Sequence, residues 1–295
     1  MEQRTEVMLL REAELELKEK HMKEILKEEV GRSLRSRGMT LSLALGGIIA
    51  AAQVIHYQVP YHDWNLTNDM EAFPILYPFA VADSWIGGST EYLEGFLYFL
   101  IIPILAVLPF GASYFSDQAS GFLKGLYTRV SRKDYLAAKY LAAFLSGGLA
   151  VVLPLVLNLM CALVLLPNLT PQSVFAHNGI CAASLFYQIY FSHPAVYIVI
   201  FLCLDFVMGG VWACTALACS FLSDYKIVVA VCPFFLQLMI HVICTMLNGI
   251  DYSSVYFTQS GYGIQNALVP AAYVLLGLMS AWVIFRKKGA KVDIF

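Results

Sequence analysis

The fold of this chain is decided where two apolar runs flank a charged segment. The runs are LYFLIIPILAVLPFGASYF at residues 97–115 and LAAFLSGGLAVVLPLVLNLMCALVLL at residues 141–166, with SGFLKGLYTRVSRKDYLAAKY at 120–140 between them. Each run can cross a membrane as a helix, because about 20 mainly apolar residues span the hydrocarbon. The segment between them carries five lysines and arginines and keeps helical spacing. The chain is therefore predicted to leave the membrane there, form helix outside it and re-enter.

The composition of the whole chain agrees with a membrane protein. Of its 295 residues, 59% are hydrophobic and 14% are charged, whereas a soluble domain is about 45–50% apolar and about 25% charged. The strongly charged N-terminal segment does not have the pattern of a cleavable signal peptide, so the first apolar span is expected to direct insertion. Six spans are predicted, at residues 39–59, 96–115, 140–166, 195–222, 227–247 and 267–285. We therefore expect an all-α polytopic membrane protein.

The lysines and arginines are confined to one side of the predicted membrane. With six spans, all of them fall in the N-terminal segment, the connections after the second and fourth spans, or the C-terminal tail. The other connections, at about 60–95, 167–194 and 248–266, contain no lysine or arginine and carry acidic residues instead. Because positively charged loops stay in the cytoplasm, both termini are predicted to be cytoplasmic and these three loops external.

Three parts of the chain are predicted: a charged helix at 1–38, a membrane domain at 39–285 and a basic tail at 286–295. Residues 12–38 are rich in strong helix formers. Their thin apolar stripe consists of Leu15, Met22, Leu26 and Val30. Two interpretations are open, namely a solvated helix that leads into the first span, or a helix that lies along the membrane face or against a cytoplasmic partner.

No constellation for catalysis or metal binding is visible in the sequence. The phosphate loop G-x-x-x-x-G-K-[ST] and the motifs G-x-G-x-x-G, H-E-x-x-H and G-x-S-x-G are all absent. His56, His62 and Asp63 lack the spacing of a common metal site, and the seven cysteines form no Cys-x-x-Cys pair. The cysteines are interpreted as small packing residues. We expect no enzyme activity in this chain itself, no directly bound cofactor and no nucleic-acid partner.

Polar residues within the predicted spans are candidates for function. Asp205 lies near the middle of the fourth span, where a carboxylate is costly unless it is paired, protonated or in contact with water. Its candidate neighbours are Asn158, Gln237 and His241, and Gln53 lies at a similar depth. Two interpretations are open: a structural hydrogen-bond network between helices, or the polar lining of a translocation route. Small residues predicted to let helices pack closely are Ser146, Gly147 and Gly148.

The charged loop at about 117–139 is predicted to contain two helical pieces. Apolar residues that recur at steps of three and four are Phe122, Leu123, Leu126, Tyr127 and Val130. They indicate a short amphipathic helix on the cytoplasmic face. Ser131 and Asp134 then form a capping box, which predicts a new helix that continues into the third span.

This loop resembles the first cytoplasmic loop of type-2 ABC exporter permeases. The matching residues are Asp117, Ser120-Gly121, Lys124, Arg129-Val-Ser-Arg-Lys133, Tyr135 and Ala138-Lys139, together with Glu28-Glu-Val-Gly-Arg32 and Trp85-Ile-Gly-Gly88. The resemblance implies that the short helix is a coupling helix, which docks in a groove on a separate ATPase subunit. The implied docking face is Phe122, Leu123, Leu126 and Tyr127, with Lys124 and Arg129 at its rim.

The resemblance also implies the partners of the chain. Six spans make half a transporter, so a second permease subunit is expected, in a homodimer or a heterodimer. ATP and Mg²⁺ would be bound by the ATPase subunits, in a bacterial cytoplasmic membrane whose lipids surround the spans. The implied cargo is a peptide, drug or lipid-like molecule. The alternative is a membrane carrier without an ATPase, or an immunity or structural membrane protein.

Overall fold

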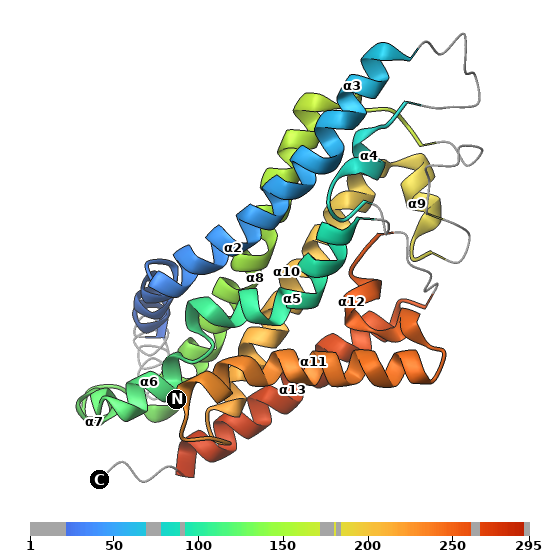
Figure 1. Cartoon of the computed structure of the whole chain (residues 1–295). Helices are drawn as coiled ribbons and strands as arrows, with labels where there is room; N and C mark the ends of the chain where they lie inside the picture. The colour runs from blue at the N-terminus through green and yellow to red at the C-terminus, as the bar shows by residue number, and fades with distance from the viewer. Residues whose placement is uncertain are drawn as a thin grey trace, which may run out of the picture.

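The computed structural model describes residues 22–68, 78–88, 92–171, 180, 184–260 and 266–291. These parts of the chain form helices and no strand (Figure 1). Six of the helical segments are long and apolar enough to cross a membrane. The predicted all-α, polytopic fold with six membrane-spanning segments is therefore confirmed.

The six spans are built from the following elements. The first consists of α2 (Arg37–Gln53), a π-helical turn (Val54–Gln58) and α3 (Val59–Thr67), and the second of α5 (Leu93–Phe110) and α6 (Ser113–Ala119). The other four are α8 (Arg132–Leu165), α10 (Pro194–Cys219), α11 (Lys226–Met246) and α13 (Leu268–Lys291). Shorter helices are α4 (Val81–Ser84), α7 (Phe122–Leu126), α9 (Tyr187–Ser192) and α12 (Ser254–Phe257), with a 3₁₀ turn at Ile250–Tyr252.

The first span is longer than predicted. The predicted segment ended at residue 59, directly before Pro60. In the structure Pro60 lies at the start of α3, directly after the π-helical turn, so its missing N–H does not end the helix. The turn also places Gln53 and Gln58, five residues apart, on the same buried face.

α10 packs against α5, α8, α11 and α13, whereas α2 packs against α5 and α8. Figure 1 shows α2, α5, α8 and α10 side by side, with α11 and α13 inclined to them. α8 and α10 meet where Gly147 faces Gly209: a Cβ added to Gly147 would lie 3.0 Å from the carbonyl oxygen of Gly209. This close approach, with buried Ser146 and Gly148 beside it, confirms the predicted role of these small residues.

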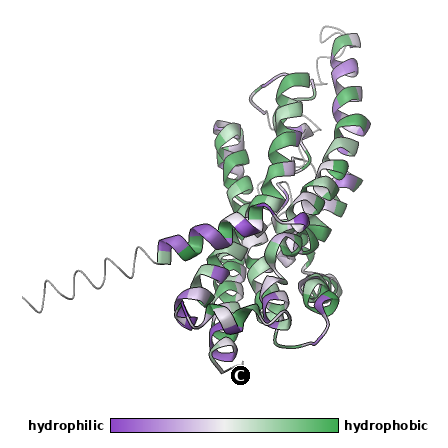
Figure 2. Cartoon of the chain, turned by 90° about the vertical axis from the view of Figure 1, so that its left-hand side faces the viewer, coloured by the Kyte–Doolittle hydropathy of each residue, from purple (hydrophilic) through white to green (hydrophobic). Residues whose placement is uncertain are grey.

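Hydrophilic residues gather at the ends of the bundle. Figure 2 shows apolar residues along the spans and hydrophilic ones along the N-terminal helix, which is described over residues 22–34 and runs across one end of the bundle. α6, α7 and the end of α13 lie at this same end, whereas α3, α4 and α9 lie at the other (Figure 1). The described lysines and arginines all lie at the first of these ends, which is called the basic end below.

Candidate functional site: the basic end of the bundle

The N-terminal helix is docked on its own chain. Its buried residues are Ile25, Glu29 and Ser33, which follow one another at four-residue steps along one helix face. Ser33 donates a hydrogen bond from its hydroxyl to the carbonyl oxygen of Val30 at 2.8 Å. Within the described residues the helix is thus not simply solvated, and a glutamate rather than a leucine lies at the centre of its contact face.

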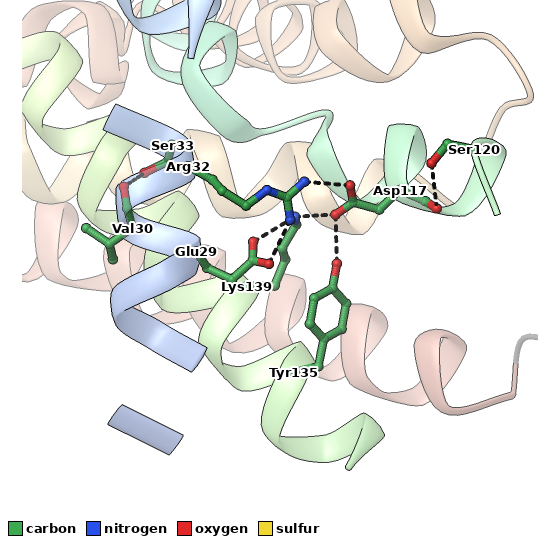
Figure 3. Close-up of polar contacts among 8 residues, drawn as sticks. All are labelled: Glu29, Val30, Arg32, Ser33, Asp117, Ser120, Tyr135 and Lys139. Carbon is green, nitrogen blue, oxygen red and sulfur yellow. Dashed lines mark hydrogen bonds and ion pairs between the residues drawn. The ribbon is translucent and has the colours of Figure 1, made fainter. Parts of the chain in front are cut away.

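Glu29 belongs to a cluster of ion pairs in which Arg32 is partly exposed and the other side chains are buried (Figure 3). The side chain of Lys139 is 0% exposed, and its Nζ lies 2.9 Å from Oε2 of Glu29 and 2.5 Å from Oδ2 of Asp117. Arg32 binds the other oxygen of each carboxylate, at 2.8 Å in both cases. Tyr135 donates its hydroxyl to Oδ2 of Asp117 at 2.8 Å. We call these five residues the ion cluster.

The ion cluster joins three segments that are far apart in the sequence. Glu29 and Arg32 come from the N-terminal helix, Asp117 from α6, and Tyr135 and Lys139 from α8. Its two carboxylates and two cations balance, so the cluster is neutral. Burial of charges is costly unless they are paired and hydrogen-bonded. The geometry meets that requirement, because all four carboxylate oxygens are bonded.

Aromatic rings lie next to the two cations of the ion cluster. The Nζ of Lys139 lies 4.2 Å from the ring centroid of Phe110, and the guanidinium of Arg32 lies 5.2 Å from that of Phe122. Both distances are within the range of cation–π attraction. Since Phe122 is the first residue of α7, Arg32 connects the cluster to that short helix.

α7 turns its apolar side toward its own chain. Gly121, at φ 73°, makes the left-handed turn into the helix, a conformation that glycine adopts without strain. Leu123 is 1% exposed, and Leu126 and Tyr127 pack half-buried against the core. Phe122 is 46% exposed. The predicted short helix is therefore present.

The predicted docking face of α7 needs correction. Leu123 is buried within the chain and cannot contact a partner, because the apolar stripe of the helix is used to attach it to the bundle. The outward face consists instead of Phe122, Lys124 and Gly125 of α7 and of Arg129 in the turn that follows the helix. Lys124 and Arg129, which the resemblance placed at the rim of the docking face, are both exposed.

The predicted capping box is present at the start of α8, where Ser131 is the N-cap residue. The hydroxyl oxygen of Ser131 accepts a hydrogen bond from the backbone N–H of Asp134 at 3.2 Å and donates one to its carboxylate at 2.5 Å. The next residue, Arg132, lies 4.9 Å above the ring of Tyr127 and donates a hydrogen bond to the carbonyl oxygen of Ala290 at 2.7 Å. The end of α13 is thereby linked to the region of α7.

Two of the polar residues predicted to be functional meet in the membrane domain. The side-chain amide of Asn158 donates to Oε1 of Gln53 at 2.8 Å, and Gln58 donates to the same oxygen at 2.9 Å. Gln53 donates to the carbonyl oxygen of Ser84, and Asn158 accepts from the N–H of Ile86. These bonds hold the segment around α4 against the first and third spans, as the structural interpretation of these residues predicts.

The other three polar residues make no hydrogen bond to this network or to one another among the described residues. Gln237 donates to the carbonyl oxygen of Phe99 at 3.1 Å, and Nδ1 of His241 lies 2.9 Å from the hydroxyl of Ser253. Asp205 is fully buried, and neither carboxylate oxygen has a hydrogen-bond partner among the described residues. The structure therefore does not pair Asp205 with the expected neighbours, because their side chains are bonded elsewhere.

Another buried carboxylate lies near the opposite end, in α4, where it contacts α9. Asp83 is 7% exposed and accepts a hydrogen bond from the hydroxyl of Tyr190. Burial raises the pKa of Asp83 to about 6, although the hydrogen bond from Tyr190 acts in the opposite direction. The sequence assigned this residue only to an external loop.

We expect Asp83→Asn to make stability less dependent on pH. The pKa of the Asp83 carboxyl is 3.8 when the group is fully solvated, as in the unfolded chain, and about 6 in the folded chain. The folded chain therefore binds a proton at Asp83 more tightly than the unfolded chain does. The resulting stability is present below about pH 4 and is lost as the pH rises through about 6, a change of at most about 3 kcal/mol. Melting temperatures of both proteins in detergent between pH 4 and pH 7 measure this. A variant whose profile is as steep as that of the wild type would contradict the assignment.

An apolar hollow lies among α10, α11 and α13. Its volume is about 550 Å³, and its wall includes Trp212, Leu236, Tyr273 and Gly277. No charged side chain lines it among the described residues. Its size and lining are those of a site for a hydrophobic ligand.

Comparison of the chain with protein-family models, with curated proteins and with solved structures gives no match.

Proposed function

We propose that this chain is the membrane-spanning permease subunit of an ATP-driven ABC exporter, and that α7 docks on a separate ATPase subunit. The observation that carries the proposal is the division of the α7 surface. Leu123 fixes the helix to the bundle, whereas Lys124, Gly125 and Arg129 are exposed at the end of the molecule. A docking helix needs both a firm attachment to its own chain and a free face for its partner.

The ion cluster supports the transmission of movement from α7 to the spans. Asp117 precedes α7 in the chain, Lys139 follows it in α8, and Arg32 stacks on Phe122. Separating buried, hydrogen-bonded charges is strongly unfavourable. A displacement of α7 is therefore expected to move the second span, the third span and the N-terminal helix together.

The ATPase supplies the energy in this proposal. The chain has no phosphate loop, so ATP and Mg²⁺ are bound by the partner. The basic end faces the cytoplasm of a bacterial cell, in agreement with the distribution of lysine and arginine. Two permease subunits, identical or related, complete the transporter.

The apolar hollow favours a hydrophobic cargo. Its wall carries aromatic and aliphatic side chains from α10, α11 and α13, and its volume of about 550 Å³ can hold part of a peptide, drug or lipid-like molecule. The only polar groups of its wall are indole, hydroxyl and backbone groups of the described lining residues. We therefore expect the cargo to enter with an apolar portion first.

Isolation of the protein from its native membrane tests the proposal. A tagged chain extracted in mild detergent is expected to co-purify with a protein that has a phosphate loop and ATPase activity. Charge reversal of the exposed face, Lys124→Glu with Arg129→Glu, should release that protein, whereas Lys133→Glu, outside α7, should not. Isolation of the intact chain without any nucleotide-binding protein contradicts the proposal.

One observation favours a second candidate, an ion-coupled carrier. Asp205 is buried and has no hydrogen-bond partner among the described residues, and it is the kind of intramembrane carboxylate that proton-coupled transporters use. Transport by the Asp205→Asn variant separates the two functions. An ATP-driven exporter retains transport that depends on ATP, whereas an ion-coupled carrier loses transport driven by a proton gradient.

A further inference from the structure

A hollow at the basic end lies beside the ion cluster. It has a volume of about 400 Å³ and is lined by the residues where the N-terminal helix meets α2, the corner between α5 and α6, and the start of α11. Arg32, Arg37 and Lys226 contribute three cationic groups to its wall. Because α2 and α11 begin at Arg37 and Lys226, these two cations mark the ends of two membrane spans.

The charge of this hollow is not balanced. Arg32 and Asp117 are part of its wall, but both are paired within the neutral ion cluster. Arg37 and Lys226 are exposed, and neither makes an ion pair or side-chain hydrogen bond with a described residue. The hollow therefore carries two uncompensated positive charges, which attract an anion.

A hydroxyl group in the wall also lacks a partner. Oγ of Ser113 is buried and makes no hydrogen bond within the described residues. The neighbouring hydroxyls are occupied, since Ser36 donates to the carbonyl oxygen of Pro109 at 3.0 Å and Ser116 to that of Ala112 at 3.2 Å. A buried hydroxyl without a partner is unfavourable, so a ligand that accepts a hydrogen bond from Ser113 relieves this cost.

The rest of the wall is apolar. Leu108, Pro109 and Phe110 extend from the hollow into the second span. A soluble anion makes no use of this surface, whereas the glycerol and upper acyl groups of a lipid would pack on it. Basic pockets at the ends of membrane helices are suited to anionic lipid headgroups.

We propose that this hollow binds the phosphate of an anionic phospholipid headgroup, with Arg37 and Lys226 pairing with the phosphate and Ser113 donating a hydrogen bond to it. The bound lipid would join the start of the first span to the start of the fifth. This site does not depend on the proposed ATPase partner and applies to any function of the chain.

Binding of phosphatidylglycerol to the purified full-length chain tests this site. Native mass spectrometry in detergent gives the affinity for phosphatidylglycerol, for phosphatidylcholine as the zwitterionic control, and for inorganic phosphate. We expect phosphatidylglycerol to bind selectively, and Arg37→Gln with Lys226→Gln to weaken it roughly 30-fold. Ser113→Ala should weaken it about tenfold.

A matched pair of substitutions serves as the control. Arg35→Gln with Lys287→Gln removes the same charge from exposed positions at the same end that do not line the hollow. It should change the affinity less than about threefold, and the melting temperature without lipid shows that each variant is folded. Equal losses in both pairs would overturn the site in favour of general charge attraction. Saturation by inorganic phosphate that phosphatidylglycerol does not displace would overturn the lipid assignment.

Discussion

Replacing Lys139 by methionine is expected to lower the free energy of unfolding by about 3–5 kcal/mol. The side chain of Lys139 is fully buried and bonds to both carboxylates of the ion cluster. Methionine fills a similar volume but leaves Glu29 and Asp117 with only Arg32 to compensate two charges. Denaturant unfolding in mild detergent, followed by intrinsic fluorescence, measures the loss.

Two further variants separate the ion pairs from simple loss of a lysine. Lys133→Met removes an exposed lysine from the same helix, and should change stability by no more than about 0.5 kcal/mol. In the Lys139→Met variant the two carboxylates share one cation. Adding Glu29→Gln removes the excess negative charge and should recover part of the lost free energy of unfolding. Additive effects of the two cluster substitutions would contradict the coupling between these residues.

Replacing Gly125 by tryptophan is expected to reduce ATP-driven transport strongly while leaving the chain itself stable. Gly125 lies on the outward face of α7, and a Cβ added there meets no atom within 4 Å. Its backbone conformation is also open to other residues, because its φ is not in the left-handed region. Stability should therefore change by less than about 0.5 kcal/mol. At a packed interface the large ring would cost about 1–3 kcal/mol, enough to reduce transport roughly tenfold or more.

Gly47 provides the matched control for this substitution. It lies in α2 within the membrane domain, and a Cβ added there also meets no atom within 4 Å. Gly47→Trp should leave ATP-driven transport within about twofold of the wild type. Transport assays in proteoliposomes with the ATPase added, together with melting temperatures, compare the two variants. Full transport by Gly125→Trp would contradict docking through α7.

Much of the fold could be predicted because membrane insertion leaves a strong local pattern. Long apolar runs identify the six spans, and Ser131 with Asp134 identifies the start of α8. The extension of the first span beyond residue 59 was missed because the π-helical turn, which lets the helix continue through Pro60, depends on packing of Gln53 and Gln58. That packing is not visible in the residues near Pro60.

The ion cluster could not be predicted, because its members are distant in sequence. Glu29 and Lys139 are separated by 110 residues, and Arg32 and Asp117 by 85. The charge pattern assigned Arg32 and Lys139 to the cytoplasmic side, and all five members lie in the segments that carry the resemblance, but neither observation pairs them with one another. The spacing of Tyr135 and Lys139, four residues apart at the start of an apolar helix, is the only local sign that this lysine shares a buried face.

The orientation of α7 shows a similar limit. Helical spacing identifies an apolar stripe but does not distinguish a stripe that binds a partner from one that binds the same chain. Leu123 was assigned to a partner and is instead buried against the bundle. Asp205 could likewise be recognised as unusual, whereas its lack of a partner required the positions of Asn158, Gln237 and His241.

Site-specific crosslinking in the native cell tests the central claim most directly. A photoreactive amino acid at Lys124, on the outward face of α7, is compared with one at Leu66, an exposed residue at the opposite end of the bundle. If α7 docks on an ATPase, position 124 gives a crosslink to a protein that contains a phosphate loop, and position 66 gives none. Absence of a nucleotide-binding protein from the crosslinks at position 124, or its equal presence at both positions, would contradict the account.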